Sequence, residues 1–297
     1  MSTREELIGA VDRYLEALGR NDPSRLPLSP NVRFTENCQA LPLGKGLWAT
    51  ATPFEVARPH FVDVVEPASG QIACFAVVRE EDQPAILSLR LKVEDPSTLR
   101  PGSGQAGSGR AVISEVETLV ARQPADGRFR VFNPDELLQP RAAFQETLAP
   151  AERAPRAEMV RLAHLYFDGV VSGKGDIIPT LPGCIRIENG VQTVLNAEGQ
   201  SETMKLSVVD QVNTGIFRDI EAARERRFPV VDEEKGLIFA VFFWDHPGPV
   251  TAAAFTSRYR EPNSMMVAEI FKIKSRRFHH IEAVLNVFPY GTRSGWD

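Results

Sequence analysis

An internal repeat constrains the fold of this 297-residue sequence more than any other feature: the second half resembles the first at an offset of about 152 residues. A predicted helix carries YLEAL at 14–18 in the first copy and YFDGV at 166–170 in the second. Roughly twenty residues after its tyrosine, each copy enters a short strand, VRFTEN at 32–37 and IRIEN at 185–189. The repeated order predicts one fold formed twice, each copy with its own core.

The later segments repeat in the same order as a hairpin, a long strand and a final strand. They lie at 61–78, 111–121 and 128–132 in the first copy, and at 227–244, 265–274 and 278–287 in the second. The middle pair places Glu115 opposite Glu269. Because runs of strands after helices favour antiparallel pairing, we predict an α+β fold in which a curved antiparallel sheet wraps around helices in each copy.

The sequence therefore predicts two tandem cone-shaped domains. The first spans 1–150, with a linker from about 133, and the second spans 151–297. The stretch PGSGQAGSG at 101–109 is predicted to be a flexible loop, because it holds too few apolar residues to form a core.

Composition and charge exclude several classes of function. The net charge is −5 and the Lys and Arg residues are scattered among acids, so no basic stripe is present for nucleic acid. Cys38, Cys74 and Cys184 form neither a CxxC nor a zinc-binding pattern, which predicts free thiols. The N-terminal segment is a charged amphipathic helix, and no apolar run approaches the length of a membrane span. We expect a cytoplasmic protein without a nucleic-acid or membrane partner.

Four segments carry a resemblance to a known family: LPLGKGLW at 41–48, RIENGVQ at 186–192, RRFPVVDEEKGLIFAVFFWDHPG at 226–248 and IEAVLNVFPYGTRSGW at 281–296. Through them the chain resembles tandem SnoaL-like proteins of fungi and bacteria. The helix, the Asn21-Asp22 pair and the acid-bearing strand are also similar to the start of the wider superfamily of nuclear transport factor 2 and ketosteroid isomerase. This resemblance implies a cone enclosing a small-molecule pocket, with acid-base chemistry that needs no cofactor.

The resemblance also assigns roles to individual positions. A tyrosine on the first helix can polarise a carbonyl in catalytic members, and Tyr14 and Tyr166 occupy that position. An aspartate on the short strand is often the base, whereas Asn37 and Asn189 stand there in this sequence. Since asparagine cannot accept a proton, the simplest isomerase mechanism is in doubt.

Acids and arginines flank these asparagines. Glu36 and Glu188 are the nearest carboxylates, but neighbours on a strand face opposite sides, so the glutamate and asparagine of one pair cannot both line a pocket. Arg33 and Arg186 could bind a substrate carboxylate or an oxyanion, or form a salt bridge with the nearby glutamate. Solvated acids at the edge of the sheet are the alternative reading of the glutamates.

Four of the five histidines lie in the second copy, which makes it the better candidate for catalysis. His164 and Asp168 are four residues apart on a helix and could form an oriented pair. His280 shares one strand face with Glu282 and Asn286, and that face could line a pocket or meet water. Periodicity alone does not decide between these alternatives.

We predict a cofactor-independent lyase, dehydratase or isomerase, with retro-aldol cleavage among the reactions that fit, acting on a small apolar or aromatic oxygenated molecule. Glu188, His280 or His164 would move the proton, while Tyr166 and Arg186 would stabilise the oxyanion. Substrate contacts are expected from Arg186, Asn189, Asn286, Asp168, Tyr14, Arg33, Glu36 and Asn37.

The sequence leaves two other functions open. The chain could be a non-catalytic binding protein, or its first copy could merely shield the sheet of the second. A homodimer through the sheet faces is a further alternative. No metal-ligand spacing or nucleotide-binding loop is present, so we expect no metal and no cofactor.

Overall fold

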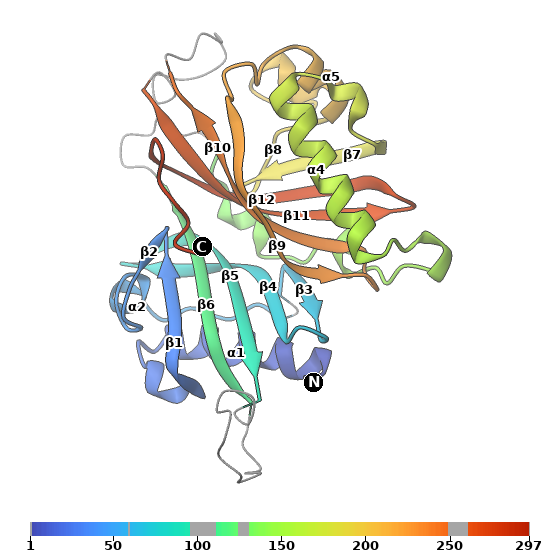
Figure 1. The fold of residues 1–297 in the computed structure, drawn as a ribbon. Coiled ribbons are helices and arrows are strands. Elements are labelled where there is room, and N and C mark those ends of the chain that lie inside the picture. The colour runs from blue at the N-terminus through green and yellow to red at the C-terminus, as the bar shows by residue number, and fades with distance from the viewer. Residues whose placement is uncertain (1, 59, 96–110, 124–130, 249–260, 297) are drawn as a thin grey trace.

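The computed structural model describes residues 2–58, 60–95, 111–123, 131–248 and 261–296. It contains two similar halves, each built from a few helices and a six-stranded sheet (Figure 1). The predicted α+β fold class is confirmed, and the two halves are consistent with tandem cone-shaped units. The predicted loop at 101–109 lies outside the described residues.

The first half forms one mixed sheet over its helices. Its elements are α1 (Arg4–Leu18), η1 (Pro23–Arg25), β1 (Leu28–Glu36), β2 (Gln39–Ala40), α2 (Leu47–Thr50), β3 (Val62–Glu66), β4 (Gln71–Glu80), β5 (Gln83–Glu94) and β6 (Val112–Arg122). A capping box between Thr3 and Glu6 starts α1. The buried side of α1, including Leu7, Val11 and Tyr14, packs on one face of the sheet.

The linker and the second half follow in the same order. The linker holds η3 (Pro134–Leu137), α3 (Ala142–Gln145) and η4 (Pro150–Glu152). The second half holds α4 (Arg156–Ser172), η5 (Gly175–Ile177), β7 (Thr180–Glu188), β8 (Val191–Gln192), η6 (Glu202–Lys205), α5 (Val208–Asn213), β9 (Ala222–Asp232), β10 (Leu237–His246), β11 (Asn263–Lys274) and β12 (Arg277–Pro289).

Both sheets have the same strand order, β2-β1-β6-β5-β4-β3 in the first half and β8-β7-β12-β11-β10-β9 in the second. Neighbours are antiparallel except for β1 with β6 and β7 with β12, which are parallel. The expectation of purely antiparallel sheets is therefore corrected. The first strand of each half enters the sheet beside the last strand and runs in the same direction.

The strand order also corrects the predicted alignment of the two copies. The hairpin pairs β3–β4 and β9–β10 correspond as predicted, but β11 corresponds to β5 and β12 to β6. A shared contact fixes the register: the Val93 amide donates to the Gly70 carbonyl at 2.8 Å, and the Ile273 amide donates to the Gly236 carbonyl at 2.7 Å. The match of 111–121 with 265–274 is thus wrong by one strand.

Two errors combined to shift this alignment. The strand β5 was not recognised in the sequence, and a final strand was predicted at 128–132 instead. Of that segment, Val131 and Phe132 lie outside any strand, and the rest lies outside the described residues. The residue equivalent to Glu115 is consequently His280 rather than Glu269.

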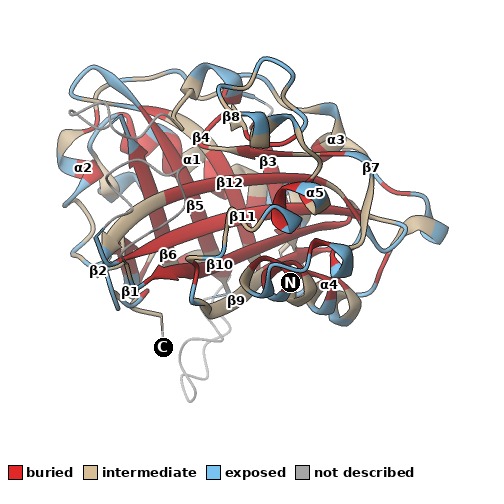
Figure 2. Ribbon diagram, turned by 90° about the horizontal axis from the view of Figure 1, so that it is seen from above, coloured by how far each residue is buried: buried red, intermediate tan, exposed pale blue. Residues whose placement is uncertain are grey.

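The two halves pack against each other through the faces of the sheets that point away from the helices. We call this the outer face of each sheet, and the face that covers the helices the inner face. Phe75 and Phe239 meet there with ring centroids 6.5 Å apart, inside an apolar cluster to which both sheets contribute. Figure 2 shows buried residues along most of the strands. Every residue of β10 is buried, because a core covers each face.

The C-terminal segment returns from the second half to the first sheet (Figure 1). The Trp296 ring lies between two guanidinium groups, with the Arg33 Cζ 4.2 Å and the Arg90 Cζ 4.5 Å from the ring centroid. Its indole Nε1 donates to the Thr35 hydroxyl at 2.7 Å. Cation–π contacts of this kind are each worth about 0.5–2 kcal/mol, so the tail helps to hold the halves together.

A buried histidine fastens α1 to the first sheet. The two ring nitrogens of His60 lie 2.9 Å from Asp63 Oδ1 and 3.1 Å from Asp12 Oδ1. Burial lowers the pKa of His60, but hydrogen bonds and charge from Asp63 and Asp12 outweigh it, and the net pKa is raised above 6.5. The imidazolium therefore bridges two carboxylates in the folded state.

We expect the His60→Gln variant to lose about 1–3 kcal/mol of unfolding free energy at acidic pH, because a charged donor pair is removed. Since the folded-state pKa is raised, this stabilisation is complete below about 6.5 and disappears as the pH rises through the folded-state value. Denaturant titrations at several pH values measure the difference. A difference that stays constant with pH would show that His60 is neutral.

None of the described helices combines the length and the apolar character needed to span a bilayer.

Candidate functional site

Two acids and two alanines form a row across the inner face of the second sheet. Ala240 of β10 is paired with Glu269 of β11, Glu269 with Ala283 of β12, and Ala283 with Glu188 of β7. Glu269 lies on the inner face because its strand neighbours Val267 and Phe271 belong to the core around α4. The short alanine side chains on both sides of Glu269 leave space above the sheet for its carboxyl group.

A tyrosine and an arginine complete this arrangement. Tyr166 lies on the buried side of α4, and Arg186 lies two residues before Glu188 on the same face of β7. The Arg186 Nη1 donates to the Tyr166 hydroxyl at 3.3 Å, and its Nε lies 3.5 Å from Glu188 Oε1. The Nη2 donates to the side-chain oxygen of Gln211 in α5. We call Tyr166, Arg186, Glu188, Gln211 and Glu269 the inner cluster.

Glu269 is the most perturbed acid of the inner cluster. It is 3% exposed, and none of the residues that the structure describes forms a hydrogen bond with its Oε2. Burial raises the pKa of Glu269 well above 4.5; Arg186 opposes this shift, and the charge of Glu188 adds to it. Burial also raises the pKa of the Tyr166 hydroxyl. At neutral pH, Glu269 and Tyr166 are therefore two neutral O–H groups beside a cation.

Glu188 differs from Glu269 in its exposure to solvent. Its side chain is 25% exposed, whereas the Arg186 side chain is only 4% exposed. Glu188 lies at the end of β7, where the strand turns into β8. It is thus an acid of the inner cluster that water or a ligand can reach.

The two asparagines at the expected base positions have another role. Asn189 is in the left-handed region, with φ +44°, and its side-chain amide pairs with the backbone of Leu285, accepting at 2.9 Å and donating at 3.0 Å. Asn37 pairs in the same way with Val120, accepting from its amide at 2.8 Å. Each asparagine side chain thus extends the parallel strand pairing. It is the glutamates, Glu36 and Glu188, that are on the inner side.

The first half lacks the inner cluster although it shares the fold. Tyr14 corresponds to Tyr166, but its hydroxyl accepts from the Trp48 indole at 3.0 Å. Phe34 and Leu89, both buried, stand where the second half has Arg186 and Glu269. The duplicated fold therefore carries the charged groups in its second copy.

Glu36, the counterpart of Glu188, binds the backbone at the start of a helix. Its carboxylate accepts from the Leu47 amide at 2.8 Å, which places it at the N-terminal end of α2. Gly46, with φ +64°, allows this approach, because a Cβ at that position would lie 2.7 Å from a Glu36 oxygen. Arg33 lies on the outer side of β1, against Trp296. Glu36 is thus bound to the backbone of α2, and Arg33 points away from the core of the first half.

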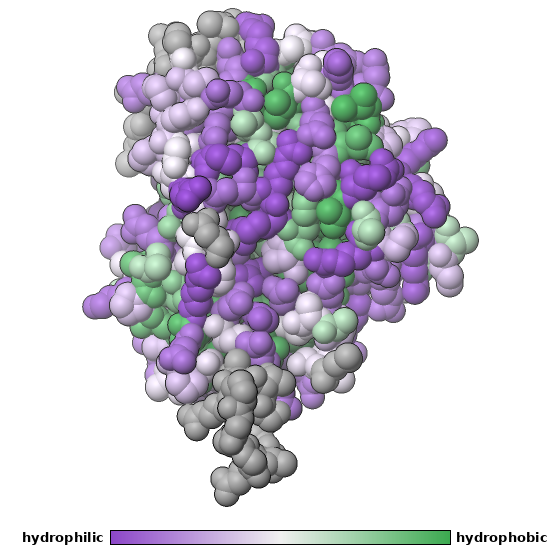
Figure 3. Space-filling view, viewed as in Figure 1, coloured by the Kyte–Doolittle hydropathy of each residue, from purple (hydrophilic) through white to green (hydrophobic). Residues whose placement is uncertain are grey.

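His164 and Asp168 lie on the outside of α4 and share one partner. The Arg226 Nη1 is 3.3 Å from His164 Nδ1 and donates to Asp168 Oδ1 at 2.7 Å. Arg226 belongs to the edge strand β9, whose sequence at 224–227 is charged throughout. Figure 3 shows a hydrophilic band across this face of the molecule. The structure does not bring this pair to the inner cluster.

His280 and Asn286 lie on the outer face of β12. The His280 ring packs on Phe144 of the linker with centroids 4.7 Å apart, and burial lowers the pKa of His280 to about 3. Asn286 donates from its amide to the Val120 carbonyl of the other sheet at 3.3 Å. Of the predicted residues, the structure brings together Tyr166, Arg186 and Glu188.

Sequence reasoning missed Glu269 and Gln211. The signal for Glu269 was a single acid inside the otherwise apolar run MMVAEIF at 265–271. An acid in such a position is buried on a strand and needs a partner or a raised pKa. Gln211 carries no comparable signal, because its role depends on how α5 folds over β7.

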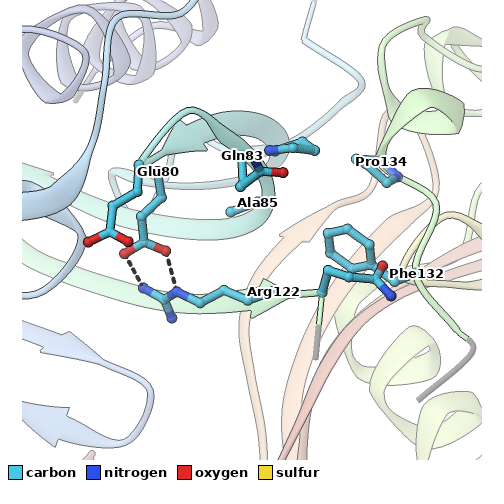
Figure 4. Close-up of a pocket in the computed structure, with 9 residues that line it drawn as sticks. Glu80, Gln83, Ala85, Arg122, Phe132 and Pro134 are labelled. Atoms are coloured by element: carbon cyan, nitrogen blue, oxygen red, sulfur yellow. Dashed lines mark hydrogen bonds and ion pairs between the residues drawn. The ribbon is translucent and has the colours of Figure 1, made fainter. Parts of the chain in front are cut away.

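A separate hollow opens at the surface where β4 turns into β5, beside the end of β6 (Figure 4). It has a volume of about 800 Å³ and is lined by residues that include Glu80, Gln83, Arg122, Phe132 and Pro134. The Arg122 guanidinium points toward Glu80 and donates to Glu80 Oε1 at 2.9 Å. The charges of Arg122 and Glu80 are thus paired with each other. The residues predicted for catalysis do not line this hollow.

The match to a family model lies in the second half of the chain. The model of a family described as a domain of unknown function, DUF8021, matches residues 152–285, which is less than half of the chain. Among solved structures, the chain is similar to a protein described as a SnoaL-like polyketide cyclase from Jannaschia sp. CCS1. The identity is 12%, the match covers 48% of this chain and 91% of that chain, and the TM-score is 0.28. The search of curated proteins found no match.

Proposed function

We propose that the second half is a cofactor-independent acid-base catalyst that acts on a small molecule with a carbonyl group. The observation that carries this proposal is the buried, neutral Glu269 on the inner face beside Tyr166 and Arg186. A buried acid with an unpartnered oxygen lowers stability, which is typical of a group kept for function. The apolar counterparts Phe34 and Leu89 in the first half support a role specific to the second.

The proposed reaction starts with Glu188, which takes a proton from the carbon next to the carbonyl. The electron pair of the broken C–H bond moves to the carbonyl oxygen and gives an enolate. Tyr166 and the neutral Glu269 donate hydrogen bonds to that oxygen, and such donors stabilise developing negative charge in a buried site. In a β,γ-unsaturated ketone, return of the proton to the γ carbon gives isomerisation. In a β-hydroxy ketone, the β-hydroxyl group leaves as water with the proton held by Glu188, which gives dehydration.

A proton-exchange assay tests this proposal without a known substrate. Enolisable ketones and β-hydroxy ketones with apolar or aromatic bodies are incubated with the full chain in D₂O, and mass spectrometry follows deuterium incorporation. We expect exchange into at least one compound. The Glu188→Gln variant should slow it by about 10²- to 10⁴-fold, because the general base is lost.

The matched control is Asp168→Asn, which makes the same chemical change at an exposed acid of α4. This variant should keep the wild-type exchange rate. Saturable binding of these compounds without exchange would instead favour the alternative of a non-catalytic binding protein. Equal rates in both variants would remove Glu188 from the mechanism.

A further inference from the structure

We infer that the molecule bound by the inner cluster carries a carboxylate, which docks on Arg186 by replacing the side-chain oxygen of Gln211. This inference rests on the proposed function for the location of the site and adds the chemical class of the ligand. It leaves the carbonyl chemistry to Glu188, Tyr166 and Glu269.

The guanidinium of Arg186 is buried and its hydrogen bonds go to neutral oxygens. Arg186 is 3% exposed. Its Nε donates to the Thr193 hydroxyl at 3.2 Å and its Nη1 to the Tyr166 hydroxyl at 3.3 Å, while its Nη2 donates to the Gln211 amide oxygen. Buried arginine is normally matched by a carboxylate that accepts two parallel N–H bonds.

The nearby acids do not supply such a partner. Glu188 Oε1 is 3.5 Å from the Arg186 Nε, and the Glu188 side chain is partly in solvent. Glu269 is held in its neutral form by burial, so it contributes no full negative charge. The fork of Arg186 is therefore occupied by neutral acceptors that a ligand anion can replace with a gain in electrostatic energy.

Gln211 occupies the position on Arg186 that a ligand carboxylate would take. Its Oε1 accepts from the Arg186 Nη2, and its Nε2 donates to the carbonyls of Thr193 at 2.8 Å and Thr203 at 2.9 Å. Turning the amide away from Arg186 breaks these two backbone contacts as well. The charged pairing of a ligand carboxylate with Arg186 must outweigh that loss, and binding should become tighter when the amide is removed.

The side chains around Arg186 indicate what the rest of the ligand should be like. The Phe217 ring is half-buried and its centroid is 5.3 Å from the Arg186 Cζ. The alanines Ala240 and Ala283 flank Glu269 on the sheet below. These apolar side chains favour a ligand whose carboxylate is attached to an apolar or aromatic body.

Benzoate and its neutral isostere benzamide provide the test. The resonance of the Arg186 Nε–H group is followed by NMR in the full chain as each compound is added. We expect benzoate to shift this resonance saturably and benzamide to leave it unchanged at the same concentration. Gln211→Ala should bind benzoate several-fold more tightly, because no amide oxygen has to be displaced, and Arg186→Met should not bind it.

Three results would overturn the inference. They are equal shifts with benzoate and benzamide, no shift with either compound, and a benzoate affinity of Gln211→Ala equal to that of the wild-type protein. Thermal unfolding checks that Arg186→Met is folded, and Gln211→Ala gives an independent answer if it is not. If benzoate binds but no compound exchanges deuterium, the proposed catalysis fails and the carboxylate site stands. If deuterium exchange occurs but benzoate binds no better than benzamide, the carboxylate site fails and the proposed catalysis stands.

Discussion

Glu269→Leu is expected to lower catalytic turnover by about 10²- to 10³-fold and at the same time to raise the stability of the protein. The loss follows from the removal of one O–H donor to the enolate oxygen. The gain follows because a buried carboxyl with an unpartnered oxygen is replaced by an apolar side chain of similar size. The first half already has this arrangement, with Leu89 at the equivalent position.

Deuterium exchange and chemical denaturation of the same samples measure the two effects. The stability gain should be about 1–3 kcal/mol at neutral pH. It should grow with pH, because the raised pKa of Glu269 makes the wild-type protein lose stability as the pH rises toward the folded-state value. Leu89→Met is the matched control in the first half and should leave exchange unchanged. A variant that loses both activity and stability would show that Glu269 is structural.

The fold could be predicted from the sequence because its signals are local and occur twice. The tyrosine-bearing helix, the short strand with Glu188 and the hairpin at 227–244 each have a counterpart in the first half. Tyr166 was found for the same reason, because Tyr14 is its counterpart. Arg186 was found as the arginine of the acid-bearing strand, although its true counterpart is Phe34. The alignment failed at β5, which was not recognised although 85–93 (AILSLRLKV) is a largely apolar run, and the failure moved Glu269 to the wrong counterpart.

The side of the sheet to which each side chain points could not be predicted, because both faces of these sheets are buried. In β12 the inner Ile281, Ala283 and Leu285 and the outer His280, Glu282 and Val284 are all buried, so alternation between apolar and polar residues gives an incomplete signal. His280 was consequently grouped with the candidate catalytic residues although it lies between the sheets. Only the packing of one half on the other decides this.

A pair of equivalent glutamates between the sheets leads to the second prediction with a large effect. Glu117 of β6 and Glu282 of β12 occupy corresponding positions on the two outer faces, and both are buried. Glu117 accepts from the Arg90 Nε at 2.8 Å and from the Arg227 Nη1 at 3.2 Å. Burial raises the pKa of Glu117, but Arg227 and Arg90 outweigh it, so the net pKa is lowered and Glu117 is ionised.

Glu282 has the opposite protonation state. Within the described part of the chain, the cation paired with it is Arg141 of the linker, whose Nε is 3.4 Å from Glu282 Oε2, and its Oε1 has no hydrogen-bond partner there. Burial raises the pKa of Glu282 from 4.5 to about 8, although Arg141 opposes the shift. Equivalent positions thus hold a carboxylate in one sheet and a carboxylic acid in the other, because the first has two guanidinium partners.

The same substitution should therefore have different effects at the two sites. Glu117→Gln should cost up to about 3–5 kcal/mol at neutral pH, because it removes the anion shared by the buried Arg90 and the half-buried Arg227. The contribution of Glu117 is present above its unfolded-state pKa of 4.5 and is lost as the pH falls through its lowered folded-state value. Glu282→Gln should change the unfolding free energy by less than about 1 kcal/mol at mildly acidic pH, because the wild-type group is already neutral there.

Raising the pH separates the two variants further. The wild-type protein loses stability between the unfolded-state pKa of Glu282, 4.5, and its folded-state value of about 8, because folding holds a proton that the unfolded chain has released. Glu282→Gln abolishes this loss and should become more stable than the wild-type protein by several kcal/mol above about pH 8. Denaturant titrations from mildly acidic to alkaline pH measure both curves. Parallel curves for the two variants would mean that the number of arginine partners does not set the charge of these glutamates.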